Sequence, residues 1–177
     1  MAKSYKEYLK HITTFIFDVD GVLTDGTVTI TTKGEMLRRM NIKDGYAIKT
    51  AVDQGYNICV ISGGSNEGVR LRLKGLGVND IYLGAHNKID QMNEFLHIYD
   101  IKLENVLYMG DDIPDLSVMQ VIGLPCCPQD AVPEIKEVSK YISHKKGGKG
   151  AVRDVIEQVL KVQGKWLSDD AISATYD

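Results

Sequence analysis

Short apolar runs alternate with helical patterns along most of the chain. Apolar runs typical of buried strands occupy residues 12–17, 57–61, 81–83, 106–109, 123–126 and 141–143. Apolar positions with helical spacing occupy residues 44–54, 66–76, 88–99, 115–121 and 151–162, with Asp44 as the expected N-cap of the first helix. This repeated strand and helix order predicts an α/β fold, a three-layer Rossmann-like sandwich with a mostly parallel sheet.

One stretch after the first strand has a different pattern. Residues 27–30 and 35–40, joined by Thr32-Lys33-Gly34, predict a β-hairpin insertion. An isolated hairpin is marginally stable, so we favour a role in assembly, with a simple flap over the sheet as the alternative. We expect a single domain over residues 1–177, with a core at about 12–163, the hairpin at about 27–40, and a polar, acidic tail at 164–177.

Composition narrows the class of protein but not its chemistry. The 177 residues are 44% hydrophobic and 25% charged, which is enough to bury a core, and the net charge of −3 shows no basic excess for nucleic acid. No apolar run approaches the roughly 18 to 20 residues of a membrane span. The charged N-terminus lacks a signal peptide's apolar centre, and Cys59, Cys126 and Cys127 form neither a disulfide framework nor a zinc motif. We therefore expect a cytoplasmic protein without nucleic-acid or membrane partners.

Two carboxylates follow the first predicted strand in the segment Asp18-Val19-Asp20-Gly21. Two carboxylates at this spacing leave the turn on one side, where one serves as nucleophile and metal ligand and the other protonates a leaving group. Taken alone, the segment is equally typical of an ordinary Asp-Gly turn.

A second acidic group, Gly110-Asp111-Asp112 with Asp115, follows the predicted strand at 106–109. Carboxylate oxygens suit Mg²⁺, which takes one or two of them together with substrate phosphate. Asp111 is the expected direct ligand, whereas Asp112 and Asp115 are expected to orient the ligand set or a lysine. The alternative for Asp112 and Asp115 is ordinary acidic charge at a helix N-terminus.

Two further segments predict phosphate contacts. Ser62-Gly63-Gly64 lies between a strand and a helix, where a hydroxyl and backbone amides form a phosphate site, or simply a plain turn. Lys88 begins a helix, an unfavourable end for a cation, which favours a fixed charge on a phosphoryl oxygen, although a lone lysine is more often a solvated surface residue.

Together, these segments resemble the haloacid dehalogenase superfamily of phosphohydrolases over about residues 12–163. The stretch from Phe15 to Gly26 is similar to that family's first motif. Because an alkoxide leaving group needs a proton and a halide does not, Asp20 favours phosphoester over carbon–halogen cleavage. The superfamily's ion-pumping ATPases carry Thr where this chain has Asp20, so this subgroup is disfavoured as well.

The resemblance implies a role for each site residue. Asp18 would attack phosphorus and form an aspartyl-phosphate, and Asp20 would protonate the leaving group and then activate water. Ser62 and Lys88 would hold the transferring phosphoryl group. Asp18, the backbone carbonyl of Asp20, and Asp111 would bind the Mg²⁺ cofactor.

The short intervals between these motifs leave no room for a cap domain. The cap-less pattern is similar to one branch, the tetrameric phosphatases of 3-deoxy-manno-octulosonate (KDO) 8-phosphate, in its segments 41–46, 69–77 and 147–153. The resemblance implies a homotetramer whose neighbouring subunits cover the site, a small phosphorylated sugar acid as substrate, and a role in lipopolysaccharide precursor synthesis. Gly63, Gly64 and Arg72 would contact the substrate, with the Arg72 guanidinium on its carboxylate.

Three other functions stay open. Phosphatases of a nine-carbon keto-deoxy sugar acid carry charges where this chain has Gly64 and Gly75, which favours the eight-carbon substrate, although eight-carbon enzymes often carry Arg in place of Gly64. A phosphomutase would have to exclude water, which the missing cap disfavours. A non-catalytic assembly module of a sugar-acid activation pathway is the third, and the intact acidic set argues for activity instead.

Overall fold

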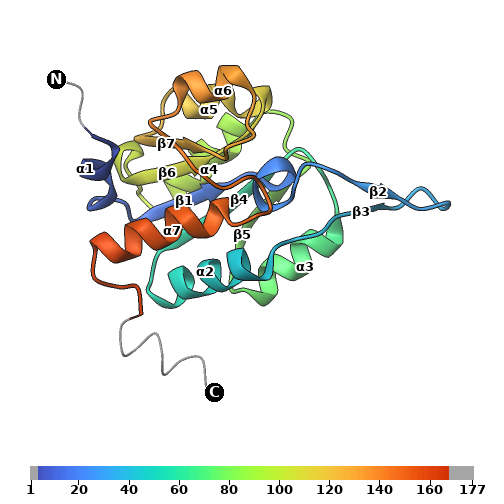
Figure 1. The fold of residues 1–177 in the computed structure, drawn as a ribbon, viewed down its shortest axis with the longest axis horizontal. Coiled ribbons are helices and arrows are strands. Elements are labelled where there is room, and N and C mark those ends of the chain that lie inside the picture. The colour runs from blue at the N-terminus through green and yellow to red at the C-terminus, as the bar shows by residue number, and fades with distance from the viewer. Residues whose placement is uncertain (1–3, 168–177) are drawn as a thin grey trace.

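A six-stranded sheet forms the centre of the computed structural model, which describes residues 4–167 (Figure 1). The strand order is β5-β4-β1-β6-β7-β8, and every neighbouring pair in this sheet is parallel. The strands are β1 Thr14–Phe17, β4 Asn57–Ser62, β5 Asp80–Leu83, β6 Val106–Met109, β7 Leu124–Cys127 and β8 Tyr141–Ile142. The predicted α/β sandwich is confirmed.

Helices cover both faces of this sheet. α2, α3 and α7 pack on one face, and α4, α5 and α6 pack on the other (Figure 1). The helices are α1 Tyr5–Leu9, α2 Ile42–Asp53, α3 Glu67–Gly75, α4 Lys88–Ile98, α5 Leu116–Met119, α6 Pro133–Val138 and α7 Ala151–Val162. α1 and α6 were not predicted, because a helix of five or six residues is too short to display an apolar period.

The central strand divides its side chains between two apolar cores. Phe15 and Phe17 pack with α2, α3 and α7, whereas Ile16 packs with α4, α5 and α6, and all three are fully buried. Successive strand residues point to opposite faces, so a strand covered on both sides is apolar throughout. Each buried phenylalanine contributes about 1.5–3 kcal/mol, and together they fix the strand from which Asp18 emerges.

One predicted helix start is wrong, and another predicted helix is shorter than expected. Asn41 rather than Asp44 caps α2, since the Asn41 carboxamide accepts hydrogen bonds from the backbone amides of Lys43 (2.8 Å) and Asp44 (3.4 Å). Asp44 is instead buried in the first turn of α2, facing α7. The helix predicted at 115–121 is present as the shorter α5, Leu116–Met119, and a 3₁₀ turn, Ile113–Asp115, leads into it.

The predicted hairpin is present with shorter strands. β2, Thr29–Ile30, and β3, Met36–Leu37, form only two residue pairs and project from the body of the molecule (Figure 1). Ile30, Met36 and Leu37 are each more than half exposed on it. Residues 168–177 of the predicted tail lie outside the described residues, and no helix within 4–167 is both long and apolar enough to span a bilayer.

Candidate active site

The predicted catalytic residues meet at one edge of the sheet. β1 lies between β4 and β6, so the residues that follow these three strands come together at their carboxyl ends. Asp18 directly follows β1, Ser62 is the last residue of β4, and Asp111 lies two residues beyond β6. Lys88 is the first residue of α4, the helix that follows β5, and β5 lies beside β4 in the sheet. The side chain of Lys88 reaches the same place.

The turn after β1 is wound more widely than an α-helix. The backbone amide of Thr24 donates to the carbonyl of Val19 at 3.0 Å, and Gly21 lies inside this turn with a φ of +87°. A Cβ at Gly21 would overlap the Asp111 carboxylate. Glycine is therefore required both for the backbone conformation and for the close approach of Asp111 to the turn.

Lys88 is a buried cation between two carboxylates. Its Nζ lies 2.9 Å from Oδ1 of Asp18 and 2.7 Å from Oδ1 of Asp115, and all three side chains are at least nine-tenths buried. Because both carboxylates bond the cation, the lysine is held in place without reaching solvent. This pairing explains why a lysine stands at the start of α4, against the helix dipole.

Both oxygens of Asp115 are already used by the protein. Oδ1 accepts from Lys88 and from the Tyr108 hydroxyl at 2.5 Å, and Oδ2 accepts from the backbone amides of Asp111 (3.0 Å) and Asp112 (3.4 Å). Asp115 therefore orients Lys88 and the Asp111 loop. The Asp112 side chain is exposed and caps the following 3₁₀ turn by accepting from the amide of Ile113 at 2.8 Å.

The acidic cluster carries more negative charge than one lysine offsets. Burial, with the charge of Asp115, raises the pKa of Asp18 to about 7 even though Lys88 opposes the shift. Burial, with the charge of Asp18, raises the pKa of Asp111 to about 8. Burial opposes the charge on Lys88, but Asp18 and Asp115 together raise its pKa. Ionising both Asp18 and Asp111 therefore calls for a further cation.

The cluster fits a divalent cation. Carboxylate oxygens of Asp18, Asp111 and Asp115 lie within 4.8 Å of one another. Oδ1 of Asp111 is buried and has no hydrogen-bond partner among the described residues. Since Asp115 is fully engaged, Asp18 and Asp111 are the side chains free to ligate, and such hard oxygen donors suit Mg²⁺.

Asp20 lies at the mouth of the site and pairs with a residue that the sequence did not single out. Arg38, just beyond β3, donates from Nε to Oδ1 of Asp20 at 2.7 Å and from Nη2 to Oδ2 at 3.0 Å. Tyr108 was also missed. The sequence marks Tyr108 only by its hydroxyl, the single polar group in the apolar run 106–109. The pairing of Arg38 with Asp20 depends on how the hairpin folds back.

Ser62 and its glycines form a tight loop before α3. The buried Ser62 Oγ accepts from the backbone amide of Gly64 at 3.2 Å. α3 begins only at Glu67 with Asn66 as its cap, so Gly63 and Gly64 precede the helix instead of opening it. The predicted phosphate loop therefore lies beside Asp18 but outside the helix N-terminus.

Arg72 lies away from the acidic cluster. It is exposed on α3, and its guanidinium packs where a Cβ of Gly45 would stand. Arg72 and Arg38 line a common cavity of 380 Å³ together with Leu37, Met40, Asn66, Gly68 and Val69. Through Arg38, this cavity adjoins Asp20.

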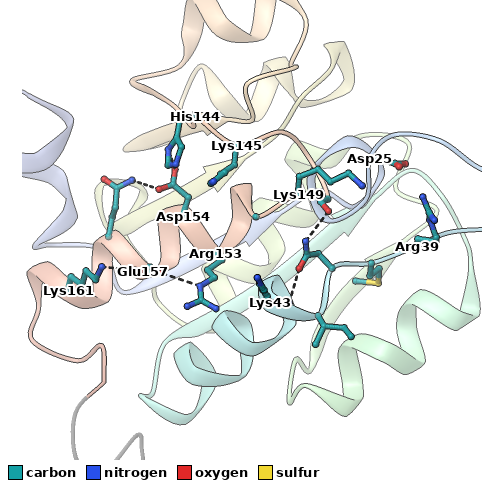
Figure 2. A pocket seen from close by; sticks show the side chains of 16 residues that line it. Asp25, Arg39, Lys43, His144, Lys145, Lys149, Arg153, Asp154, Glu157 and Lys161 are labelled. Atoms are coloured by element: carbon teal, nitrogen blue, oxygen red, sulfur yellow. Dashed lines mark hydrogen bonds and ion pairs between the residues drawn. The ribbon is translucent and has the colours of Figure 1, made fainter.

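A wider groove of 1070 Å³ runs along α7 and the loop 144–150 (Figure 2). Its labelled side chains are mostly basic, and Glu157 and Asp154 pair with some of them. The glycines at the groove's edge contact the catalytic turn, since the amide of Gly148 donates to the carbonyl of Val22 at 2.9 Å and a Cβ at Gly147 would overlap the carbonyl of Gly21. The loop 147–150 is therefore packed against the turn that holds Asp18.

Comparison with known proteins agrees with this geometry. Residues 74–156 match the family model of haloacid dehalogenase-like hydrolases. The chain is 38% identical to the 3-deoxy-D-manno-octulosonate 8-phosphate phosphatase KdsC of Salmonella typhi over 156 residues, which is 88% of this chain and 83% of that protein. The KdsC of Escherichia coli strain K12 is 37% identical over the same shares.

Solved structures give the same result. The crystal structure of the KDO 8-phosphate phosphatase from Yersinia pestis has a TM-score of 0.90 and 33% identity, and the match covers 93% of this chain and 89% of that one. That of the Moraxella catarrhalis enzyme, in complex with a magnesium ion, a phosphate ion and KDO, has a TM-score of 0.89 and 32% identity, covering 98% of both chains. The protein therefore belongs to the KdsC family of haloacid dehalogenase-like hydrolases and is a phosphoric monoester hydrolase.

Proposed function

We propose that this enzyme hydrolyses KDO 8-phosphate to KDO and phosphate with Mg²⁺ as cofactor. The observation that carries the proposal is the buried cluster of Asp18, Lys88, Asp111 and Asp115 in a chain whose relatives are named KDO 8-phosphate phosphatases. The KDO, phosphate and magnesium in the related Moraxella catarrhalis structure support the same substrate and metal. The physiological role would be lipopolysaccharide precursor synthesis in the cytoplasm.

Asp18 is the nucleophile in this proposal. Its Oδ1 accepts from the amide of Val19 at 2.7 Å and pairs with Lys88, so we assign Oδ2 to the attack on phosphorus. The new Oδ2–P bond forms as the bond from phosphorus to the sugar oxygen breaks, which gives an aspartyl-phosphate. Lys88 and Ser62 would stabilise the phosphoryl oxygens during this transfer.

Asp20 moves the proton in both half-reactions. Its carboxyl gives a proton to the departing sugar alkoxide, and the resulting carboxylate then takes a proton from the water that attacks the aspartyl-phosphate. As the new bond from water oxygen to phosphorus forms, the Oδ2–P bond to Asp18 breaks, which releases phosphate and regenerates both carboxyl groups. Asp18, Asp111 and the backbone carbonyl of Asp20 would hold Mg²⁺. The bound ion offsets charge on the transferring phosphoryl group.

Arg72 and the cavity it shares with Arg38 are suited to the other end of the substrate. A guanidinium is the preferred partner of a carboxylate, and the sugar acid carries one at the end opposite its phosphate. The exposed apolar hairpin supports a homotetramer, because Ile30, Met36 and Leu37 would otherwise stand in water. Neighbouring subunits would then cover the open site.

Phosphate release with Mg²⁺ tests the proposal. We expect turnover of KDO 8-phosphate to exceed that of the nine-carbon keto-deoxy sugar phosphate and of hexose phosphates. The matched control is Asp18→Asn, which keeps the shape of the side chain and should abolish turnover without unfolding the protein. Preference for the nine-carbon acid would contradict the assigned substrate, and substantial Mg²⁺-dependent turnover by Asp18→Asn would remove the assigned nucleophile.

A further inference from the structure

Arg38 is a largely buried cation on a hairpin that is mostly exposed. Its side chain is only 9% exposed, while that of its partner Asp20 is 36% exposed. Two parallel bonds, Nε to Oδ1 and Nη2 to Oδ2, form the bidentate pairing that a guanidinium makes best.

A third bond holds the guanidinium from its other side. Nη1 of Arg38 donates to the backbone carbonyl of Met36 at 3.1 Å, and the same carbonyl accepts from the side-chain amide of Asn66 at 3.0 Å. Asn66 caps α3 directly after the Ser62 loop. The guanidinium is therefore anchored to β3, and β3 is tied to the phosphate loop.

Gly64 leaves room for this pair. A Cβ at position 64 would stand 3.3 Å from Nη2 of Arg38 and 3.3 Å from Oδ2 of Asp20, and 3.6 Å from Oγ of Ser62. Its φ is not in the left-handed region, so the backbone itself does not call for glycine. The space beside the Arg38–Asp20 pair is the structural reason we find for glycine here.

We propose that Arg38 is a positioning residue that holds the Asp20 carboxyl in line for proton transfer to the leaving group, in space kept open by Gly64. The inference rests on the roles proposed for Asp18 and Asp20. In the structure both oxygens of Asp20 accept from Arg38. When one oxygen carries the proton and turns toward the leaving group, it gives up its bond to Arg38, and the other oxygen keeps the second bond. The guanidinium itself transfers no proton, because its pKa is too high.

The proton balance predicts a dependence on the leaving group. When a sugar phosphate is cleaved, the O–H bond of Asp20 breaks and a new O–H bond forms on the sugar oxygen. When p-nitrophenyl phosphate is cleaved, the departing p-nitrophenolate is a weak base and leaves without that proton. Misalignment of Asp20 therefore slows the first reaction and spares formation of the aspartyl-phosphate in the second.

The test compares Arg38→Met with Arg39→Met, a change at the neighbouring exposed arginine. Rates of p-nitrophenyl phosphate, phenyl phosphate and KDO 8-phosphate cleavage are measured with Mg²⁺ for each variant. Because hydrolysis of the aspartyl-phosphate is common to all three esters, the comparison uses kcat/KM, which reports the steps through departure of the leaving group. For Arg38→Met we expect kcat/KM to fall about 10- to 100-fold on KDO 8-phosphate and phenyl phosphate, but less than about threefold on p-nitrophenyl phosphate. Arg39→Met should match the wild type on all three, and Gly64→Ala should show the same selectivity as Arg38→Met with a smaller loss.

Each other outcome overturns the inference. Equal losses of kcat/KM on all three esters would assign Arg38 to the phosphoryl group or to folding, and a loss of kcat/KM on KDO 8-phosphate alone, with phenyl phosphate unaffected, would assign it to the sugar acid. Unchanged kinetics would leave Arg38 a surface ion pair. If the wild type does not cleave KDO 8-phosphate, the proposed substrate fails while the two aryl esters still decide the role of Arg38.

Discussion

Replacing Lys88 by Met removes the one cation in the described structure that bonds both Asp18 and Asp115 while keeping the length of the side chain. The lysine is 4% exposed, and its Nζ lies 2.9 Å and 2.7 Å from the two carboxylates, so the variant leaves two buried carboxylates without their shared partner. Breaking a buried ion pair by removing one partner costs about 3–5 kcal/mol. In a chain of this length, that corresponds to a fall in melting temperature of about 6–20 °C.

The loss of stability in Lys88→Met depends on pH. The pKa of Asp18 is raised from 3.8 to about 7, so its contribution to stability is present below about pH 4 and is lost as the pH rises through 7. Lys88 lowers this pKa, so its removal raises the folded value further. The stability lost in Lys88→Met should therefore be small at acidic pH, where the carboxyls are protonated, and largest above pH 7.

Denaturant unfolding of the metal-free protein at several pH values measures this effect. The control is Lys49→Met, since Lys49 pairs with Asp53 on the exposed side of α2 and such pairs contribute about 0.3–0.5 kcal/mol. We expect Lys88→Met also to lose phosphatase activity. A Lys88→Met variant that unfolds within about 0.5 kcal/mol of the wild type above pH 7 would refute the reasoning, because the buried pair would then offset no charge.

Three further changes have expected outcomes. Adding Mg²⁺ at 100 times its Kd should raise the unfolding free energy by about 2.7 kcal/mol. The metal should bind more weakly at pH 6 than at pH 8.5, because the pKa values of Asp18 and Asp111 are raised to about 7 and 8. Equal affinity at both pH values, measured by calorimetry, would contradict this. Asp44→Ala should cost about 1–2 kcal/mol in denaturant unfolding, because Asp44 accepts from the amide of Arg153 in the first turn of α7 at 2.8 Å; an unchanged midpoint would show that this bond is dispensable. If the proposed tetramer assembles through the hairpin, Ile30→Asp should reduce the mass measured by light scattering. An unchanged mass would exclude hairpin-mediated assembly.

Local patterns were sufficient to predict the sheet and the residues that meet at its edge. A fully apolar strand such as Phe15–Phe17 is visible because burial on both faces removes every polar residue, and the acid that follows marks its end. Parallel strands bring their carboxyl ends together, so Asp18, Ser62 and Asp111 were expected to meet once the strands were assigned. These inferences use neighbours in sequence and one rule of topology.

Contacts between distant segments were not visible in the same way. Asp44 has the sequence of a helix cap, yet its partner lies 109 residues away in α7, and only the docking of α7 on α2 reveals it. Burial raises the pKa of Asp44, which a cap in solvent would not experience. Arg38 lies in a polar stretch whose direction depends on the fold of the hairpin, so nothing local distinguishes it from Arg39.

The hairpin would connect the proposed assembly to the chemistry of Asp20 through one short element. Its β-strands form only two residue pairs, and such a ribbon is marginally stable without further support. Yet Arg38 follows β3 by one residue and carries both bonds to Asp20. If neighbouring subunits cover Ile30 and Leu37, assembly stabilises the strand from which Arg38 reaches the site. A dissociated subunit would then lose the alignment of Asp20 before it loses the buried Asp18–Lys88 pair, so its cleavage of sugar phosphates should fall while its cleavage of p-nitrophenyl phosphate persists.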